Sequence, residues 1–159
     1  MANSVCEVLV TEERLEAPAQ DVDLTSGAIV DFWGAVRGLE DGRQIEGIEY
    51  EAHRAMAERQ LGLVAEAAVT KFRLDQVIVH HRIGFVGTGE ASLFLRVGAK
   101  HRAAGFEASQ WIVDELKRRV PIWKRPKFKI DNLPVTEAEH REVQTGIASR
   151  RGRRPQLRR

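Results

Sequence analysis

The chain has 159 residues, of which 43% are hydrophobic and 30% are charged, a composition typical of a globular protein with one core. No apolar run approaches the roughly 18 residues of a membrane-spanning helix, and the N-terminus lacks the pattern of a secretory signal. A single cysteine, Cys6, excludes an internal disulfide framework and indicates a reducing, cytoplasmic compartment.

The basic character of the sequence belongs to its C-terminal end. The formal net charge is +2, and six arginines stand among the last ten residues, so that without them the charge falls to −4. We therefore predict one domain over 1–135 and a polar, Arg-rich, partly disordered tail over 136–159. Binding of nucleic acid through this tail is the less favoured alternative. The arginines are Arg150, Arg151, Arg153, Arg154, Arg158 and Arg159.

The first half of the chain is predicted to form three strands and one helix. Strands are expected over 27–37, which is rich in Ile, Val, Phe and Trp, and over 5–11 and 45–51, where apolar and polar residues alternate. Glycines and charges predict a loop over 38–43. Residues 52–72 have helical composition. The spacing of apolar residues in this helix predicts a buried side formed by Met56, Leu63, Val64 and Ala67.

The second half is predicted to contain three more strands, a turn and a second long helix. The strands are expected over 75–83, 91–98 and 122–130. The turn is expected over 84–89, and the helix runs from about 101 to 120, where Pro121 ends it. Two helices against a mainly antiparallel sheet define an α+β fold.

The second predicted helix carries basic residues at both ends. At its start, His101 and Arg102 lie where unpaired N–H groups and the positive end of the dipole bind phosphate or carboxylate, although a purely structural role is the alternative. Near its end, Lys117 lies about 40° from Val113 around the helix, close to the apolar side. It either reaches outward to water or is partly desolvated and available for acid–base or nucleophilic chemistry.

Two further cations are candidates for a binding site. Lys124 follows Trp123, and a cation beside a large aromatic ring suits a flat, anionic, heteroaromatic ligand. Arg37 ends a strand between glycines that allow a ligand to approach the backbone closely. As an alternative, Arg37 is an ordinary surface charge.

Metal and cofactor sites are not predicted. His80 and His81 are neighbours on a strand and point to opposite faces, and no second cysteine or helical histidine pair is present. Dinucleotide, P-loop and serine-nucleophile motifs are also absent from the sequence. Cys6 lies in an alternating apolar stretch and is interpreted as a plain strand residue.

Several segments, taken in order, resemble one family. They are 27–30, 32–37, 50–51, 56–57, 81–84, 89–90, 101–102, 106–108, 116–117 and 121–124. Their combination resembles the molybdopterin synthase large subunit family over about 27–125 of this sequence. The sequence departs from the family pattern after Arg125, where an acidic residue and a later tryptophan are expected and 126–129 read Pro-Lys-Phe-Lys.

The resemblance implies an α/β-hammerhead type of fold and a sulfurtransferase of molybdenum cofactor biosynthesis. Such a subunit transfers sulfur from the thiocarboxylated Gly-Gly end of a small ubiquitin-like subunit to cyclic pyranopterin monophosphate, forming the molybdopterin dithiolene. It works as a homodimer within a heterotetramer. The resemblance further implies that Lys117 and Lys124 are catalytic, and that Arg37, His101 and Arg102 bind substrate. A non-catalytic adaptor that binds a ubiquitin-like tail is the alternative.

Helix geometry adds one constraint to this assignment. His101 and Lys117 are sixteen residues apart on one predicted helix, which corresponds to about 24 Å. A pterin phosphate cannot span that distance. We therefore expect a second protomer to supply His101 and Arg102 to the site that contains Lys117.

Overall fold

The computed structural model describes residues 5–21 and 23–130. Its larger sheet has four strands in the order β1-β5-β7-β2. The β1–β5 pair is parallel, whereas β5–β7 and β7–β2 are antiparallel. The bounds of the strands are Cys6–Thr11 for β1, Ala28–Ala35 for β2, Gln76–Arg82 for β5 and Ala91–Ala99 for β7.

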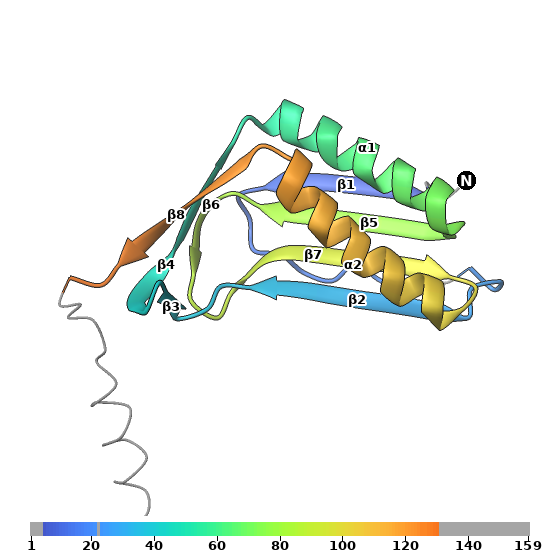
Figure 1. Cartoon of the computed structure of the whole chain (residues 1–159), viewed down its shortest axis with the longest axis horizontal. Coiled ribbons are helices and arrows are strands. Elements are labelled where there is room, and N and C mark those ends of the chain that lie inside the picture. The colour runs from blue at the N-terminus through green and yellow to red at the C-terminus, as the bar shows by residue number, and fades with distance from the viewer. Residues whose placement is uncertain (1–4, 22, 131–159) are drawn as a thin grey trace, which may run out of the picture.

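Two long helices cover the same face of this sheet (Figure 1). The first, α1 (Arg54–Phe72), packs on β1 and β5, and the second, α2 (Arg102–Arg119), packs on β7 and β2. The backbone N–H of Met56 donates to Nδ1 of His53 and caps the start of α1. The N–H of Val120 donates to the carbonyl of Leu116 at the end of α2, and Pro121 prevents further helix.

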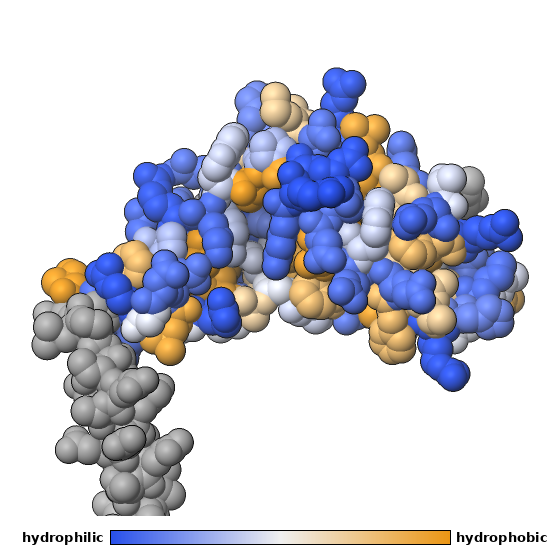
Figure 2. Space-filling view, in the orientation of Figure 1, coloured by the Kyte–Doolittle hydropathy of each residue, from blue (hydrophilic) through white to orange (hydrophobic). Residues whose placement is uncertain are grey.

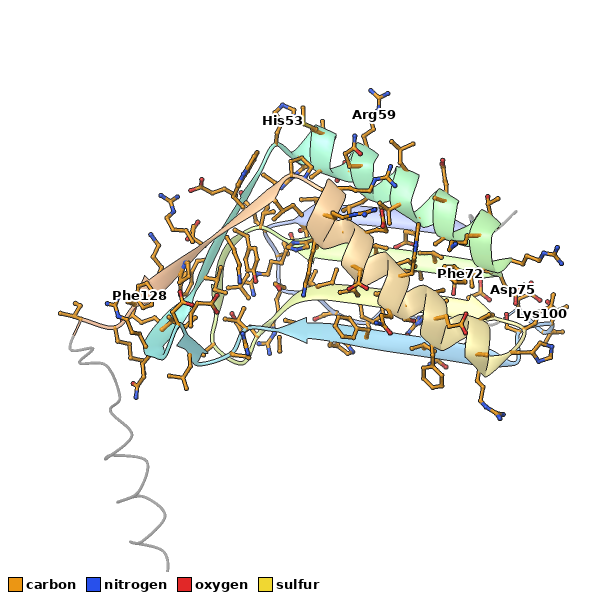
Figure 3. All side chains as sticks on the ribbon, in the orientation of Figure 1. His53, Arg59, Phe72, Asp75, Lys100 and Phe128 are labelled. Atoms are coloured by element: carbon orange, nitrogen blue, oxygen red, sulfur yellow. The ribbon has the colours of Figure 1, made fainter. Side chains whose placement is uncertain are left out.

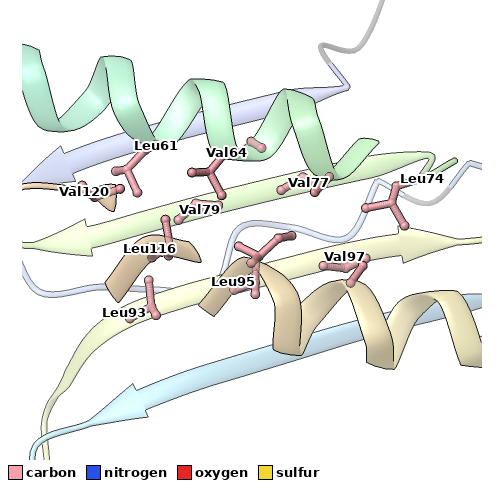
Figure 4. Packing of buried hydrophobic residues seen from close by; sticks show 14 of the residues in the cluster. Leu61, Val64, Leu74, Val77, Val79, Leu93, Leu95, Val97, Leu116 and Val120 are labelled. Carbon is pink, nitrogen blue, oxygen red and sulfur yellow. The ribbon is translucent and has the colours of Figure 1, made fainter. Parts of the chain in front are cut away.

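The main hydrophobic core lies between the helices and the sheet. Alternate residues of each strand point toward the helices, as the two-residue period of a strand requires. Figure 4 shows these side chains interleaved with those of the two helices. The core includes Leu61 and Val64 of α1, Leu116 of α2, and Val77, Val79, Leu93, Leu95 and Val97 of the sheet.

The other face of the larger sheet carries an ion pair between the buried Arg96 and the partly exposed Asp31. Both Nε and Nη2 of Arg96 donate to the carboxylate of Asp31, at 2.7 and 2.8 Å. Nη1 of Arg96 also donates to the backbone carbonyls of Pro18 and Ala19. Leu15 packs beside it in a small cluster with Ile78 and Phe94. The segment after β1 is therefore held across this face.

The smaller sheet is built on the long strand β4. It has the order β3-β4-β6, and β8 pairs antiparallel with the other edge of β4. Figure 1 shows β4 and β8 crossing obliquely at one end of the larger sheet. As an edge strand, β8 tolerates Pro126, which lies opposite Ile48. The bounds are Leu39–Glu40 for β3, Arg43–Ala52 for β4, Gly84–Gly87 for β6 and Ile122–Phe128 for β8.

The predicted α+β class is confirmed, with two long helices and mainly antiparallel strands, but two connections were wrongly predicted. The expected turn over 84–89 contains β6, because Gly84 at a φ of 80° redirects the chain into an extended segment that pairs with β4. The expected loop over 38–43 is a hairpin. Asp41 and Gly42, with φ values of 52° and 73°, form a two-residue turn between β3 and β4.

The predicted buried side of the first helix was only partly right. Val64 is buried, but Met56 and Leu63 are 53% and 43% exposed. The buried residues of α1 are instead Ala57, Leu61, Val64, Ala65 and Ala68. Alanines allow the helix to lie close to the sheet, so the side that is richest in alanine faces the core.

Three other expectations concern the ends and the surface of the chain. The last strand ends at Phe128, two residues earlier than predicted. The domain boundary at 135 and the arginine tail over 136–159 lie outside the described residues. Among the described residues, no helix is long and apolar enough to cross a membrane.

Candidate active site

A cavity of about 530 Å³ lies where the two sheets and the C-terminal half of α2 meet. Its walls are mainly apolar and come from β2, β4, α1, β7 and α2. Charged and polar side chains from β3, β4, β5, β7, α2 and β8, together with Arg37 after β2, complete the lining. The apolar lining residues include Phe32, Ile48, Leu61, Leu93, Val113, Leu116, Val120 and Ile122, and the polar ones are Arg37, Glu40, Tyr50, His81, Ser92, Lys117 and Lys124.

Lys117 reaches the cavity from the last turn of α2. This turn also carries Arg118 and Arg119, and both of these donate to the carboxylate of Glu115, at 2.5 and 3.4 Å. The hydrogen bond from Arg118 is the main cause that lowers the pKa of Glu115, which therefore stays ionised. Lys117 is exposed and forms no ion pair with any described residue, so its charge is available to a ligand.

Lys124 reaches the same cavity from β8. It lies opposite Tyr50 of β4 in the strand register, and its Nζ donates to Oε1 of Glu40 at 3.0 Å. Arg37 follows β2 directly after the buried Val36. Like Lys117, Arg37 makes no ion pair within the described part of the chain.

His81 is a polar group inside the cavity that the sequence did not single out. Its Nδ1 donates to the backbone carbonyl of Arg82 at 2.8 Å, and its ring lies edge-on to Tyr50 at 5.4 Å. Burial lowers the pKa of His81 below its ordinary value of 6.5, and the hydrogen bond to Arg82 offsets part of this shift. The ring is therefore neutral at pH 7, with Nε2 as an acceptor. His80 points to the opposite face, as predicted, and contacts Glu7 at 2.7 Å.

His101 and Arg102 do not line this cavity. His101 is the N-cap of α2, makes no capping hydrogen bond with its side chain, and is exposed like Arg102. The neighbouring Lys100 pairs with Asp75 at 3.4 Å. Figure 3 shows this pair at one end of the molecule and Phe128 of β8 at the other. The structure thus brings Arg37, Lys117 and Lys124 together and leaves His101 and Arg102 at the far end of α2.

Cys6 is not an activated nucleophile. Burial is the main cause that raises the pKa of its thiol above the ordinary 9.0, and the charge of Glu66 raises it further. Cys6 lies in β1, as predicted. Within 5–21 and 23–130, no group of three or more His, Cys, Asp or Glu residues could hold a metal ion.

Glu40 was missed because the segment 38–43 was interpreted as a loop. The dipeptide Asp41-Gly42 between extended segments is a strong hairpin signal. Had it been used, Glu40 would have been placed on a strand beside β4. The position of His81 in the cavity had no comparable signal in the sequence. A histidine buried in the core and a histidine that lines a cavity occupy the same kind of position in the alternating pattern of a strand.

The site can bind an anion beside an apolar, flat group. Arg37 and Lys117, which form no ion pair with another described residue, stand at an apolar cavity whose volume is in the range of small-molecule sites. The helix-bearing face around them is mostly hydrophilic, with isolated apolar side chains (Figure 2). Fold and site together define an α+β protein with a lysine-lined cavity for an anionic small molecule.

Comparison with known proteins identifies the family. A family model described as MoaE protein matches residues 7–119, and the chain belongs to this family. It is 44% identical over 100 residues to the molybdopterin synthase catalytic subunit of Thermoplasma volcanium, covering 63% of this chain and 73% of that protein. It is 42% identical over 110 residues to the corresponding protein of Pyrococcus abyssi, covering 69% and 74%. The human protein of the same name is 38% identical over 103 residues, covering 65% and 55%.

Solved structures have the same fold. A molybdopterin synthase from Staphylococcus aureus matches with a TM-score of 0.66 at 26% identity, covering 79% of this chain and 93% of that one. A MoaE protein from Burkholderia ambifaria matches with a TM-score of 0.62 at 20% identity, covering 89% and 98%. The elements that form the cavity therefore belong to a fold that these proteins share.

Proposed function

We propose that this chain is the catalytic subunit of a molybdopterin synthase. It transfers sulfur from the thiocarboxylated Gly-Gly end of a small ubiquitin-like subunit to cyclic pyranopterin monophosphate and so forms the molybdopterin dithiolene. The observation that carries the proposal is the convergence of Arg37, Lys117 and Lys124 on one cavity. It occurs in a member of the MoaE family whose relatives are named molybdopterin synthase catalytic subunits.

In this proposal Lys117 is the central catalytic cation. It stands at the cavity without a carboxylate partner among the described residues. The thiocarboxylate is anionic, and once its sulfur is joined to the pterin, water adds to the carbonyl carbon and negative charge develops on the carbonyl oxygen. The carbon–sulfur bond then breaks, which leaves sulfur on the pterin and a carboxylate on the small subunit. An ammonium beside this oxygen stabilises the transition state more than the ground state. Lys124 assists from β8, and Arg37 binds the anionic part of the pterin substrate.

The partner subunit and the dimer follow from the same proposal. The name of the relatives, a catalytic subunit, implies a second subunit. Because His101 and Arg102 lie at the far end of α2 from Lys117, we propose that a second copy of this chain supplies them to the cavity. The working unit is then a homodimer within a heterotetramer. We place it in the cytoplasm and assign it no metal or cofactor.

Dithiolene formation tests the proposal directly. The protein is mixed with a thiocarboxylated small subunit and cyclic pyranopterin monophosphate, and the dithiolene is quantified. Wild type should give product, and Lys117→Ala should reduce the rate by about a hundredfold, as expected when a transition-state charge is removed. Lys127→Ala, a change to an exposed lysine of β8 that does not line the cavity, is the matched control. Equal rates for wild type and Lys117→Ala would refute the catalytic assignment.

The same mixture separates the two alternatives. An adaptor would bind the Gly-Gly tail and give no dithiolene. A nucleic-acid-binding protein would depend on the six arginines of the last ten residues. Truncation after Ser149 removes all six of these arginines but no residue that lines the cavity. It should therefore leave the sulfur-transfer rate unchanged.

A further inference from the structure

We infer that Glu40 is a positioning residue that acts through Lys124. Its carboxylate holds the Lys124 ammonium in place at the cavity and prevents this lysine from acting as a third free anion-binding charge. The inference rests on the proposed function for the identity of the ligand. The pairing itself is an observation of the structure and is independent of that identity.

The backbone fixes the position of Glu40. It is the last residue of β3 and pairs with Arg43 across the two-residue turn. Both turn residues have positive φ values, as this tight type of turn requires. The N–H of Ile45 donates to the carbonyl of Gly38 at 3.0 Å and closes the hairpin on the other side of Glu40. The carboxylate is thus held by a rigid hairpin and not by a loop.

The contact with Lys124 joins two edges of the smaller sheet. Glu40 belongs to β3 and Lys124 to β8, and the strand between them is β4. The Glu40 side chain is 18% exposed and the Lys124 side chain 56% exposed. The carboxylate is therefore the more buried and less mobile partner. A charge-assisted hydrogen bond to it restrains the long, flexible lysine side chain.

The pairing divides the cavity cations into two kinds. Lys117 and Arg37 have no carboxylate partner in the described part of the chain, whereas Lys124 has Glu40. An anionic ligand that approaches Lys124 is attracted by the ammonium and repelled by the carboxylate. Glu40 should therefore weaken binding of the anionic ground state while it keeps Lys124 oriented for the reaction.

This division predicts that Glu40→Gln lowers both KM and kcat. Glu40→Gln keeps the size of the side chain and one acceptor oxygen but removes the charge. The KM for cyclic pyranopterin monophosphate should fall because repulsion is removed. The kcat should also fall, because Lys124 is held less firmly. A merely structural role for Glu40 would instead lower kcat and raise KM, or lower stability alone.

A double-mutant cycle with Lys124→Gln tests whether Glu40 acts through Lys124. In the wild-type background, Glu40→Gln should lower kcat by about fivefold, within the range of coupled contacts. In the Lys124→Gln background, the same change should leave kcat unchanged, because no ammonium remains to be positioned, whereas KM should still fall because the carboxylate still repels the ligand. Full additivity of the two substitutions in kcat would overturn the inference. Glu40→Asp is the second variant, and because it keeps the charge but not the reach, KM should stay near wild type while kcat falls.

The matched control is Glu51→Gln. Glu51 of β4 pairs with Arg125 of β8, the neighbour of Lys124, but neither residue lines the cavity. This variant should have wild-type KM and kcat. If Glu51→Gln shifted KM as much as Glu40→Gln does, loss of any carboxylate near β8 would be sufficient to change KM. That result would overturn the inference.

Failure of the proposed function can be distinguished from failure of this inference. If wild type forms no dithiolene, the proposed function fails, and the pairing is then followed by NMR of the Lys124 side chain. The Lys124 signal should move in Glu40→Gln and stay in place in Glu51→Gln. An unchanged signal in Glu40→Gln would overturn the inference whether or not the enzyme is active.

Discussion

Lys117 and Lys124 line the same cavity although they belong to different elements, α2 and β8. Pro121 ends the helix between them, and the chain then returns antiparallel to β4, with Lys124 opposite Tyr50. The two lysines therefore reach one cavity from different elements. A single helix could not arrange them in this way, because residues seven apart on a helix point along one side.

The proposed dimer predicts complementation between two inactive variants. Lys117→Ala and Arg102→Ala homodimers should each lose most sulfur-transfer activity. A mixed dimer purified with two different tags should regain about half of the wild-type rate, because one of its two sites has both residues intact. The rate of dithiolene formation by the three purified dimers checks this. A mixed dimer as inactive as its parents would contradict the proposal that each site draws on both copies.

His81 predicts a pH dependence of stability. Burial lowers the pKa of His81 below 6.5 in the native state. As the pH falls below 6.5, this histidine therefore binds a proton in the unfolded chain before it does so in the native chain. The free energy of unfolding should therefore decrease from about pH 6.5 downward and be fully retained above it. His81→Asn keeps an N–H donor for the Arg82 carbonyl but cannot titrate.

Chemical denaturation at about pH 7.5 and about pH 5 measures this effect. The loss of stability between the two conditions should be smaller for His81→Asn than for wild type. Equal losses in the two proteins would show that another group causes the acid sensitivity.

Arg96 predicts a large stability effect far from the cavity. Its side chain is 3% exposed and donates to Asp31 and to two backbone carbonyls. Arg96→Ala leaves these acceptors without a partner, so the free energy of unfolding should fall by about 3 kcal/mol. Arg125→Ala removes an ion pair with Glu51 in which both side chains are more than half exposed, and should cost less than about 1 kcal/mol. Urea denaturation of the two variants compares them, and similar losses would contradict the expected difference.

Substitutions at two glycines are expected to change the free energy of unfolding in opposite directions. Gly42 has a φ of 73° in the β3–β4 turn, so Gly42→Val should lower the free energy of unfolding by about 1–2 kcal/mol. Gly62 lies within α1, and a Cβ added there would meet no atom within 4 Å. Gly62→Ala should therefore raise stability by about 0.5–1 kcal/mol. Thermal melting of both variants checks the signs, and a stabilising Gly42→Val would show that the turn is not held at positive φ.

Much of this molecule was predictable from local patterns. The residues of both helices and of the long strands lie close to their predicted ranges, because strand alternation and helical composition are local properties. Lys117, Lys124 and Arg37, which line the cavity, were also singled out from the sequence, through a resemblance that extends over most of the domain. The separation of His101 from Lys117 followed from helix geometry alone.

The sequence by itself determined the α+β class, the candidate cations and the two separate ends of α2. Tertiary structure alone decided which side of α1 is buried, since Met56 and Leu63 are exposed while alanines face the sheet. Tertiary structure alone also decided that Glu40 accepts a hydrogen bond from Lys124 and that His81 lines the cavity. These contacts join residues as far apart as 84 positions. They depend on how two sheets meet in space, which no local pattern of residues records.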